Sequence, residues 1–318
     1  NAGDKDIMSG RLAVIDLGTN TARLLIADRY GDGSFRNVHL QREVVRMGGG
    51  FSRTKGLSMN AMQRGLSCLT RFSEVIRNYD SPDVLAVATS AVRDAINGAQ
   101  FVSQVRQEAG INLRVIDGVI EGTLTLAGVM AGLDRPCEEA LIFDIGGGST
   151  EYTLARYGRA AYVRSLPLGV VRLTEGKGAV IAMEQKIRKE LELLSHGMRQ
   201  AGVLVHSGVP LIGTAGTATT LAAISMEMED YDYRRVNNSV ISRQEVESIL
   251  ERLLPMAPEE RLNVAGLERG REDLIIAGIL ITLQTMELFG MTTMKVSDYG
   301  LLEGLVVCGA DLVDGNGT

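Results

Sequence analysis

The chain has 318 residues and a formal net charge of −6, with 45% hydrophobic and 23% charged residues. This length favours two domains, and this composition is typical of folded proteins with large cores, which argues against disorder. The acidic balance argues against general nucleic-acid binding, which needs a basic face, although a pocket can still bind an anionic substrate.

Cysteine and histidine are rare and scattered, with three of each and no CxxC pair. This pattern predicts reduced thiols in a cytoplasmic protein and argues against a disulfide framework or a zinc site. A catalytic metal is therefore expected to bind oxygen ligands, as Mg²⁺ or Mn²⁺ does. No signal peptide is expected, and the longest apolar run, residues 274–283, is too short to span a membrane.

The first predicted element is a buried strand that ends at Asp16, turns through a glycine and returns as a strand over residues 24–27. The turn consists of Gly18, Thr19, Asn20 and Thr21. Such a turn can hold phosphate oxygens with N–H groups and hydroxyls, while Asp16 can position Mg²⁺ or its water. A plain hairpin with Asp16 as turn former explains the same residues.

Helices and strands then alternate. Ser58 is predicted to cap a helix whose apolar face is Met62, Leu66, Leu69, Phe72 and Ile76. Strands over residues 84–88 and 113–116 flank a helix over residues 101–109. A helix over residues 121–130 is expected to lead into the second domain.

Arg93 and Glu121 each follow the end of a predicted strand, where ligands gather in α/β proteins. Arg93 can clamp a phosphate with two hydrogen bonds, and Glu121 can orient and deprotonate water. From the pattern alone, solvated surface charges are the favoured explanation of both residues.

A second hairpin repeats the first. A strand over residues 141–143 ends at Asp144, and the returning strand begins with Glu151. The turn contains Gly146, Gly147, Gly148, Ser149 and Thr150. Three consecutive glycines are costly in chain entropy and are best explained by a backbone that wraps a ligand. Two copies of one hairpin, about a domain length apart, predict two related domains that face each other.

A third turn of small residues follows a strand over residues 210–212 and opens a helix. Its candidate ligand-binding residues are Gly213, Thr214, Gly216 and Thr217. Phosphate or nucleotide binding at the helix N-terminus and tight packing of small residues explain this turn equally well. It is not a P-loop, because no Gly-Lys-Ser/Thr follows.

The remaining elements are mostly helical. Met183, Ile187, Leu191, Leu194 and Met198 mark a long amphipathic helix. Ser242 and Glu245 form a capping-box pattern before another helix. A buried helix over residues 272–289, a strand over 295–297 and a closing helix over 301–313 complete a mixed α/β chain.

Eight segments in series carry a family resemblance: VIDLGTNTARLLIAD, ATSAVRDA, VIDGVIEGTLTLAGV, FDIGGGSTEY, SLPLGVVRLTE, IGTAGTATTLAA, GREDLIIAG and VSDYGLLEG. Over residues 12–312 the chain resembles the exopolyphosphatase / guanosine pentaphosphate phosphohydrolase (Ppx/GppA) family of the actin-like, sugar-kinase and Hsp70 superfamily. The resemblance implies two ribonuclease H-like (actin-like) α/β domains with a ligand cleft between them. Residues 1–124 and 300–318 would form the first domain, and residues 125–299 the second.

The resemblance also implies a role for each motif. Residues 16–21 and 146–150 are similar to the two phosphate loops, and residues 213–217 to the superfamily's adenosine-type motif. The single-residue roles are metal placement by Asp144 with Asp16, a grip on the terminal phosphate by Arg93, and catalysis by Glu121 with help from Glu151. Mg²⁺ or Mn²⁺ is the implied cofactor, with K⁺ as a candidate stimulating ion.

The implied activity is release of the terminal phosphate from polyphosphate or guanosine pentaphosphate in the cytoplasm. A homodimer is the candidate assembly, and binding to nucleic acid or membrane is not expected. Thr123 and Leu302 stand where the family often has arginine, and Glu121 lacks its usual acidic neighbour. The chain resembles the short two-domain members. A superfamily kinase and a non-catalytic polyphosphate or nucleotide sensor remain alternatives.

Overall fold

The computed structural model describes residues 8–79, 83–206 and 208–313. The chain divides into two compact units, Asn1–Gly128 with Leu301–Thr318, and Val129–Gly300. The sequence placed the corresponding divisions after residues 124 and 299.

The first unit is built on a five-stranded sheet in the described part of the chain, in the order β3-β2-β1-β4-β5. Its elements are β1 (Met8–Leu17), β2 (Thr21–Tyr30), β3 (Phe35–Val44), α1 (Met59–Arg77), β4 (Asp83–Ala88), α2 (Ser90–Arg93), α3 (Gly98–Glu108), β5 (Leu113–Val115), α4 (Gly118–Gly132) and α12 (Leu301–Cys308). Strands β1, β2 and β3 form an antiparallel meander, and β4 and β5 continue the sheet in parallel with β1.

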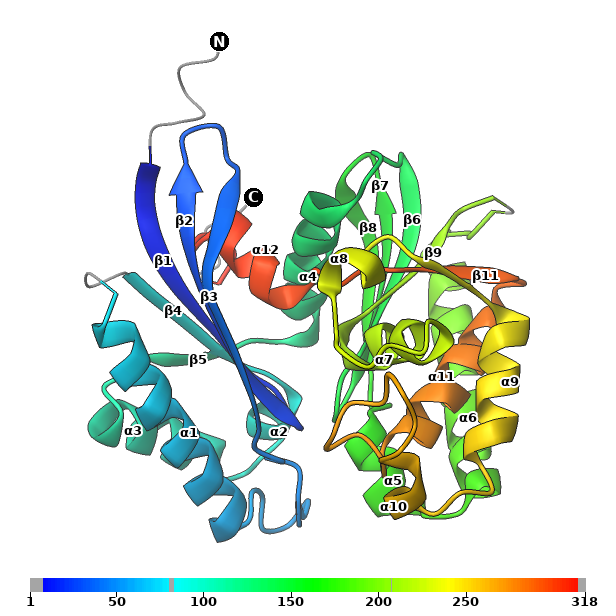
Figure 1. Ribbon diagram of the computed structural model, residues 1–318, viewed down its shortest axis with the longest axis horizontal. Helices are drawn as coiled ribbons and strands as arrows, with labels where there is room; N and C mark the ends of the chain where they lie inside the picture. The colour runs from blue at the N-terminus through cyan, green and yellow to red at the C-terminus, as the bar shows by residue number, and fades with distance from the viewer. Residues whose placement is uncertain (1–7, 80–82, 207, 314–318) are drawn as a thin grey trace. The chain divides into compact units, whose positions relative to one another are not determined.

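Alternate residues of β1 point to opposite faces of this sheet, and each face has its own core. Ala13 and Ile15 pack with α1 and α3 on one face, whereas Leu12 and Val14 pack with α12 on the other (Figure 1). The predicted cap of α1 is present, since Ser58 Oγ accepts a hydrogen bond from the N–H of Ala61 at 3.2 Å. Helices therefore pack on both faces of this sheet.

The second unit repeats this arrangement on a sheet in the order β10-β11-β9-β6-β7-β8. Its described elements are β6 (Glu139–Ile145), β7 (Thr150–Arg156), β8 (Arg159–Leu166), α5 (Val170–Lys177), α6 (Val180–Gln200), β9 (Leu211–Thr214), α7 (Ala215–Ser225), α8 (Tyr233–Val236), β10 (Val240–Ser242), α9 (Arg243–Leu253), α10 (Pro258–Arg261), α11 (Ile275–Leu288) and β11 (Thr293–Val296). Read from β8, the first five strands follow the same order and directions as β3 to β5, and β10 is an added antiparallel edge.

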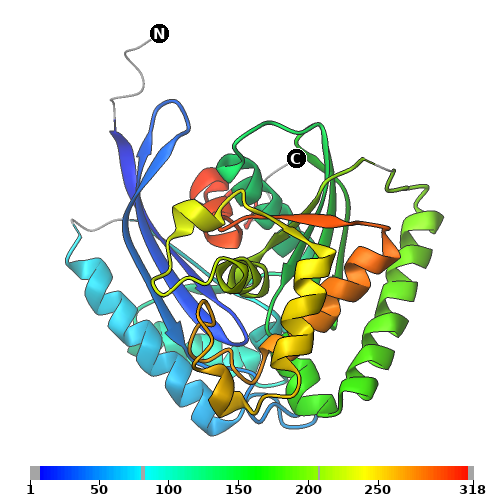
Figure 2. The same ribbon diagram turned by 45° about the vertical axis from the view of Figure 1, so that its right-hand side comes forward.

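One face of the second sheet carries a continuous apolar core. Phe143 and Tyr152 stack on it with ring centroids 6.1 Å apart, and helices α6, α9 and α11 cover it side by side (Figure 2). The capping box of Ser242 and Glu245 starts α9 as predicted. The predicted fold class, two ribonuclease H-like α/β units, is confirmed.

Several element bounds differ from the sequence expectation. The closing helix α12 ends at Cys308, because Gly309 adopts a positive φ of 63° and its N–H bonds back to the carbonyl of Leu305. Strands β3 and β8 were not predicted, because each is an edge strand whose charged side chains hide the two-residue period. Among the described residues, no helix combines the length and the apolar character needed to cross a bilayer.

Candidate active site

The two predicted phosphate loops have the same backbone turn. The N–H of Gly18 donates to the carbonyl of Thr21 at 2.9 Å, and the N–H of Gly146 donates to the carbonyl of Ser149 at 2.9 Å. Each turn begins two residues after the aspartate near the end of its strand. The repeat seen in the sequence is therefore a repeat of local geometry.

The first loop is held from behind by the chain that follows β3. The N–H groups of Val45 and Arg46 donate to the carbonyl of Asn20, each at 2.9 Å, and Gly48 donates to the carbonyl of Thr19 at 3.0 Å. Since the C=O and N–H of one trans peptide point in opposite directions, the N–H of Asn20 points away from this segment. An N–H directed in this way can bind an anion.

Asp16 lies directly opposite Arg23 in the β1–β2 ladder and forms an ion pair with it. Its Oδ2 accepts from Nε of Arg23 at 3.1 Å and from Nη2 at 2.7 Å. Its Oδ1 and both amide atoms of Asn20 are buried and have no hydrogen-bond partner among the described residues. A buried polar atom without a partner costs about 1–3 kcal/mol, so these atoms suit a bound ligand or ion.

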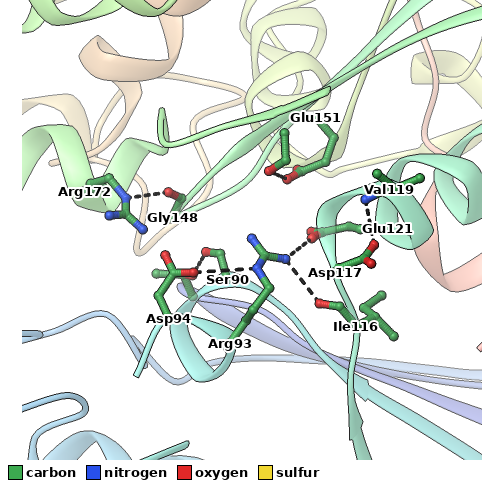
Figure 3. Close-up of polar contacts among 12 residues, drawn as sticks. Ser90, Arg93, Asp94, Ile116, Asp117, Val119, Glu121, Gly148, Glu151 and Arg172 are labelled. Carbon is green, nitrogen blue, oxygen red and sulfur yellow. Dashed lines mark hydrogen bonds and ion pairs between the residues drawn. The ribbon is translucent and has the colours of Figure 1, made fainter. Parts of the chain in front are cut away.

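The same loop contacts α2, which carries Arg93. The hydroxyl oxygens of Thr19 and Ser90 lie 3.0 Å apart, and both residues are buried. Nη1 of Arg93 donates to Oε2 of Glu121 at 3.0 Å and to the carbonyl of Ile116 at 3.3 Å (Figure 3). The structure thus brings together Arg93 and Glu121, which are far apart in sequence.

Glu121 lies in the first turn of α4, with 7% of its surface exposed. Asp117 starts this helix, because its Oδ1 accepts from the N–H groups of Val119 at 2.9 Å and Ile120 at 2.8 Å. Its carbonyl accepts from the N–H of Glu121 at 3.0 Å. This cap fixes the backbone of Glu121, and a helix N-terminus also favours a carboxylate.

In the second loop, Asp144 lies directly opposite Glu151 in the β6–β7 ladder. Both are buried, with 8% and 2% of their surfaces exposed. Oε1 of Glu151 accepts a hydrogen bond from Ser165 Oγ at 2.6 Å. Two carboxylates on one face of adjacent strands repel each other, so this pair is suited to a cation.

The residues that follow the glycines in this loop are held by the rest of the unit. The Thr150 hydroxyl donates to the carbonyl of Leu168 at 2.6 Å, and Ser149 is 4% exposed. The next residue but one, Tyr152, points into the core and forms a hydrogen bond with the Thr285 hydroxyl at 2.6 Å. Burial is the main cause that raises the pKa of Tyr152, and the charge of Glu151 adds to it. The loop is therefore anchored on the buried core of the second unit.

The third turn has its side chains engaged in packing. Thr214 Oγ1 donates to the carbonyl of Tyr299 at 2.8 Å. A Cβ added to Gly278 would lie 2.6 Å from Thr217, and one added to Gly216 would lie 1.7 Å from Nη2 of Arg271. These contacts match the tight-packing explanation of the turn, and its nucleotide role stays a prediction.

Sequence reasoning missed several residues that shape the two loops. These are Arg23, Asp117, Ser165, Gly169 and Arg172. Arg23 follows Asp16 by seven residues, which in a hairpin with this turn places both on one face, so a register argument would have found it. The contacts of Arg172 join segments that no local pattern connects.

Comparisons with known proteins agree over nearly the whole chain. The Ppx/GppA phosphatase family is matched over residues 26–311. This chain belongs to the Ppx/GppA phosphatase family. Within the described residues of this Ppx/GppA phosphatase, no group of three or more His, Cys, Asp or Glu side chains is placed to hold a metal.

Two curated relatives are each 30% identical to this Ppx/GppA phosphatase. Exopolyphosphatase 2 of Mycobacterium tuberculosis aligns over 93% of this chain and 98% of its own length. A bifunctional 3-dehydroquinate synthase/phosphatase of Fusobacterium nucleatum aligns over 94% of this chain, which spans only 46% of that protein.

Solved structures show the same fold. A PPX-GPPA enzyme of Aquifex aeolicus has 30% identity and a TM-score of 0.76, with 94% of this chain and 99% of that chain covered. An exopolyphosphatase of Cytophaga hutchinsonii has 26% identity and a TM-score of 0.84, with 96% and 98% covered.

Proposed function

We propose that this Ppx/GppA phosphatase releases the terminal phosphate of inorganic polyphosphate, of guanosine pentaphosphate, or of both, by attack of a water activated by Glu121. The pairing of Arg93 with a buried Glu121, at 3.0 Å, carries the proposal. The pair consists of a guanidinium that can bind phosphate and a carboxylate that can accept a proton, beyond the ends of β4 and β5.

Phosphoryl transfer needs positioning and neutralisation of charge more than covalent chemistry. Arg93 can bind two phosphate oxygens through its planar guanidinium. Glu121 accepts the proton of the attacking water, a role that contributes about 10²–10⁴-fold to a rate. The N–H groups of the first loop, which lies in the same unit as Arg93 and Glu121, can bind further oxygens of the transferred group.

Mg²⁺ or Mn²⁺ fits the donor atoms of the second hairpin. Asp144 and Glu151 are adjacent buried carboxylates, and Mg²⁺ is usually bound by one or two carboxylates together with substrate phosphates. Of the two carboxylate oxygens of Asp16 in the first hairpin, Oδ1 is the one suited to such a role, because Oδ2 is bonded to Arg23. When bound, the ion neutralises charge that develops on the phosphate oxygens.

The relatives support the substrate class. Exopolyphosphatase 2 of Mycobacterium tuberculosis, by its name, cleaves polyphosphate from a chain end, and it aligns over 98% of its length. Guanosine pentaphosphate presents the same terminal phosphoanhydride. Both substrates are therefore proposed on the same chemistry.

The deciding experiment measures kcat/KM for long polyphosphate, short polyphosphate and guanosine pentaphosphate side by side in Mg²⁺ and K⁺. Phosphate release from at least one of them is expected. Transfer to an added sugar or acid in place of release would identify a superfamily kinase. Tight binding of a substrate without turnover would identify a sensor.

A further inference from the structure

The glycine loop of the second unit is held from behind by helix α5. The carbonyl of Gly146 accepts from the N–H of Val170 at 3.0 Å, and the carbonyl of Gly147 accepts from the N–H of Val171 at 2.9 Å. Gly169 permits this close approach, since a Cβ there would lie 2.3 Å from the Gly147 carbonyl oxygen. Because C=O and N–H of one trans peptide oppose each other, the N–H groups of the next residues point away from α5.

The third peptide of the loop is held in a different way. The carbonyl of Gly148 accepts a hydrogen bond from Nε of Arg172 at 2.7 Å (Figure 3). The first two peptides are held by backbone N–H groups, which any sequence supplies. The Gly148–Ser149 peptide is held by a side chain, so its orientation depends on the residue at position 172.

We propose that Arg172 is a positioning residue of this loop. Its Nε holds the Gly148 carbonyl towards α5 and thereby directs the N–H of Ser149 to the opposite side, with the N–H groups of Gly147 and Gly148. Three successive N–H groups directed to one side form an anion-binding concavity. The proposal rests on the proposed function, in which this loop binds phosphate of the substrate.

Two substitutions separate positioning from charge. Glutamine places its Nε2 at the same number of bonds from the backbone as Nε of arginine, and it carries no charge. Lysine keeps the charge but places a methylene at that point. Arg172→Gln is therefore expected to lose less than about tenfold in kcat, because a neutral donor replaces a charged one. Arg172→Lys is expected to lose about 10–100-fold in kcat, with a smaller change in KM.

The matched controls are Arg164→Gln and Arg164→Lys on β8, where the arginine is exposed, and both should retain wild-type kcat. Near-wild-type kcat for Arg172→Lys, together with a large loss for Arg172→Gln, would overturn the proposal and show that the charge itself is what matters.

A second readout does not depend on turnover. In wild type and in Arg172→Gln, addition of inorganic phosphate should shift the ¹⁵N–¹H resonance of Ser149, and in Arg172→Lys this shift should be lost. An Arg172→Lys protein whose Ser149 resonance responds as in wild type contradicts the inference. A wild type that binds phosphate at Ser149 but cleaves no polyphosphate or nucleotide contradicts only the proposed function.

Discussion

The β1–β2 and β6–β7 hairpins have turns of the same kind, yet the residue opposite the aspartate carries a positive charge in the first hairpin and a negative charge in the second. Asp16 faces Arg23 across the ladder, whereas Asp144 faces Glu151. The Asp16–Arg23 ion pair joins opposite charges, whereas Asp144 and Glu151 are two acidic side chains that are both buried. The two hairpins thus have the same backbone turn and differ in the charge beside the aspartate, and the Asp144–Glu151 pair is the better suited to a cation.

The two loops also differ in what holds them. Backbone N–H groups from the segment after β3 bind the carbonyls of the first loop, while α5 and the side chain of Arg172 bind those of the second. In the first loop, the donors to the carbonyls of Thr19 and Asn20 are backbone groups. A loop held partly by one side chain is open to change by mutation.

The largest expected effect tests whether the first unit carries the reactive carboxylate. Glu121→Gln should lower kcat about 10²–10⁴-fold without unfolding the protein, because the amide cannot accept a proton from water. Phosphate release under saturating substrate measures this, with exposed Glu108→Gln on α3 as the control. Near-normal turnover in Glu121→Gln would remove this residue from the proposed role.

A smaller expected effect tests the difference in charge between the two hairpins. Asp144→Asn should raise the Mg²⁺ concentration for half-maximal activity by about 10–100-fold, the size expected for damage to a metal site. Asp16→Asn should change this concentration less, because Arg23 already neutralises Asp16. Activity against Mg²⁺ concentration checks both variants. Equal shifts in the two variants would contradict this difference between the hairpins.

Gly169→Ala tests the close approach of α5 to the glycine loop. The new methyl group would lie 2.4 Å from the carbonyl carbon of Gly148, so we expect a loss of about 1–3 kcal/mol in the free energy of unfolding together with lower kcat. A methyl group added by Gly176→Ala, inside α5, meets no atom within 4 Å, and this variant should stabilise by about 0.5–1 kcal/mol. Chemical denaturation measures both, and an unharmed Gly169→Ala protein would show that α5 can move aside.

The smallest expected effects compare the helix caps of the two units. Ser58→Ala and Ser242→Ala each remove an N-cap and should cost about 1 kcal/mol. Hydrogen exchange of α1 and α9 can report the two units separately, since a two-unit chain need not unfold in one step. Loss of protection in both helices from either variant would show that the units unfold together.

The sequence by itself determined the architecture and named most residues of the candidate site. Repeated strand–Asp–glycine-turn patterns predicted two related α/β units, and both occur with the same strand order. The apolar period of α1, its Ser58 cap and the capping box of α9 were also readable, because each depends on neighbours within a few residues.

Only the tertiary structure decided which charges meet. Arg93 and Glu121 are 28 residues apart in the sequence, and Nε of Arg172 reaches a carbonyl 24 residues away. Local patterns specify helices, turns and caps because those contacts lie within a few residues. Long-range partners follow from how the elements pack, so the sequence could name Arg93 and Glu121 as candidates but could not place either beside its partner.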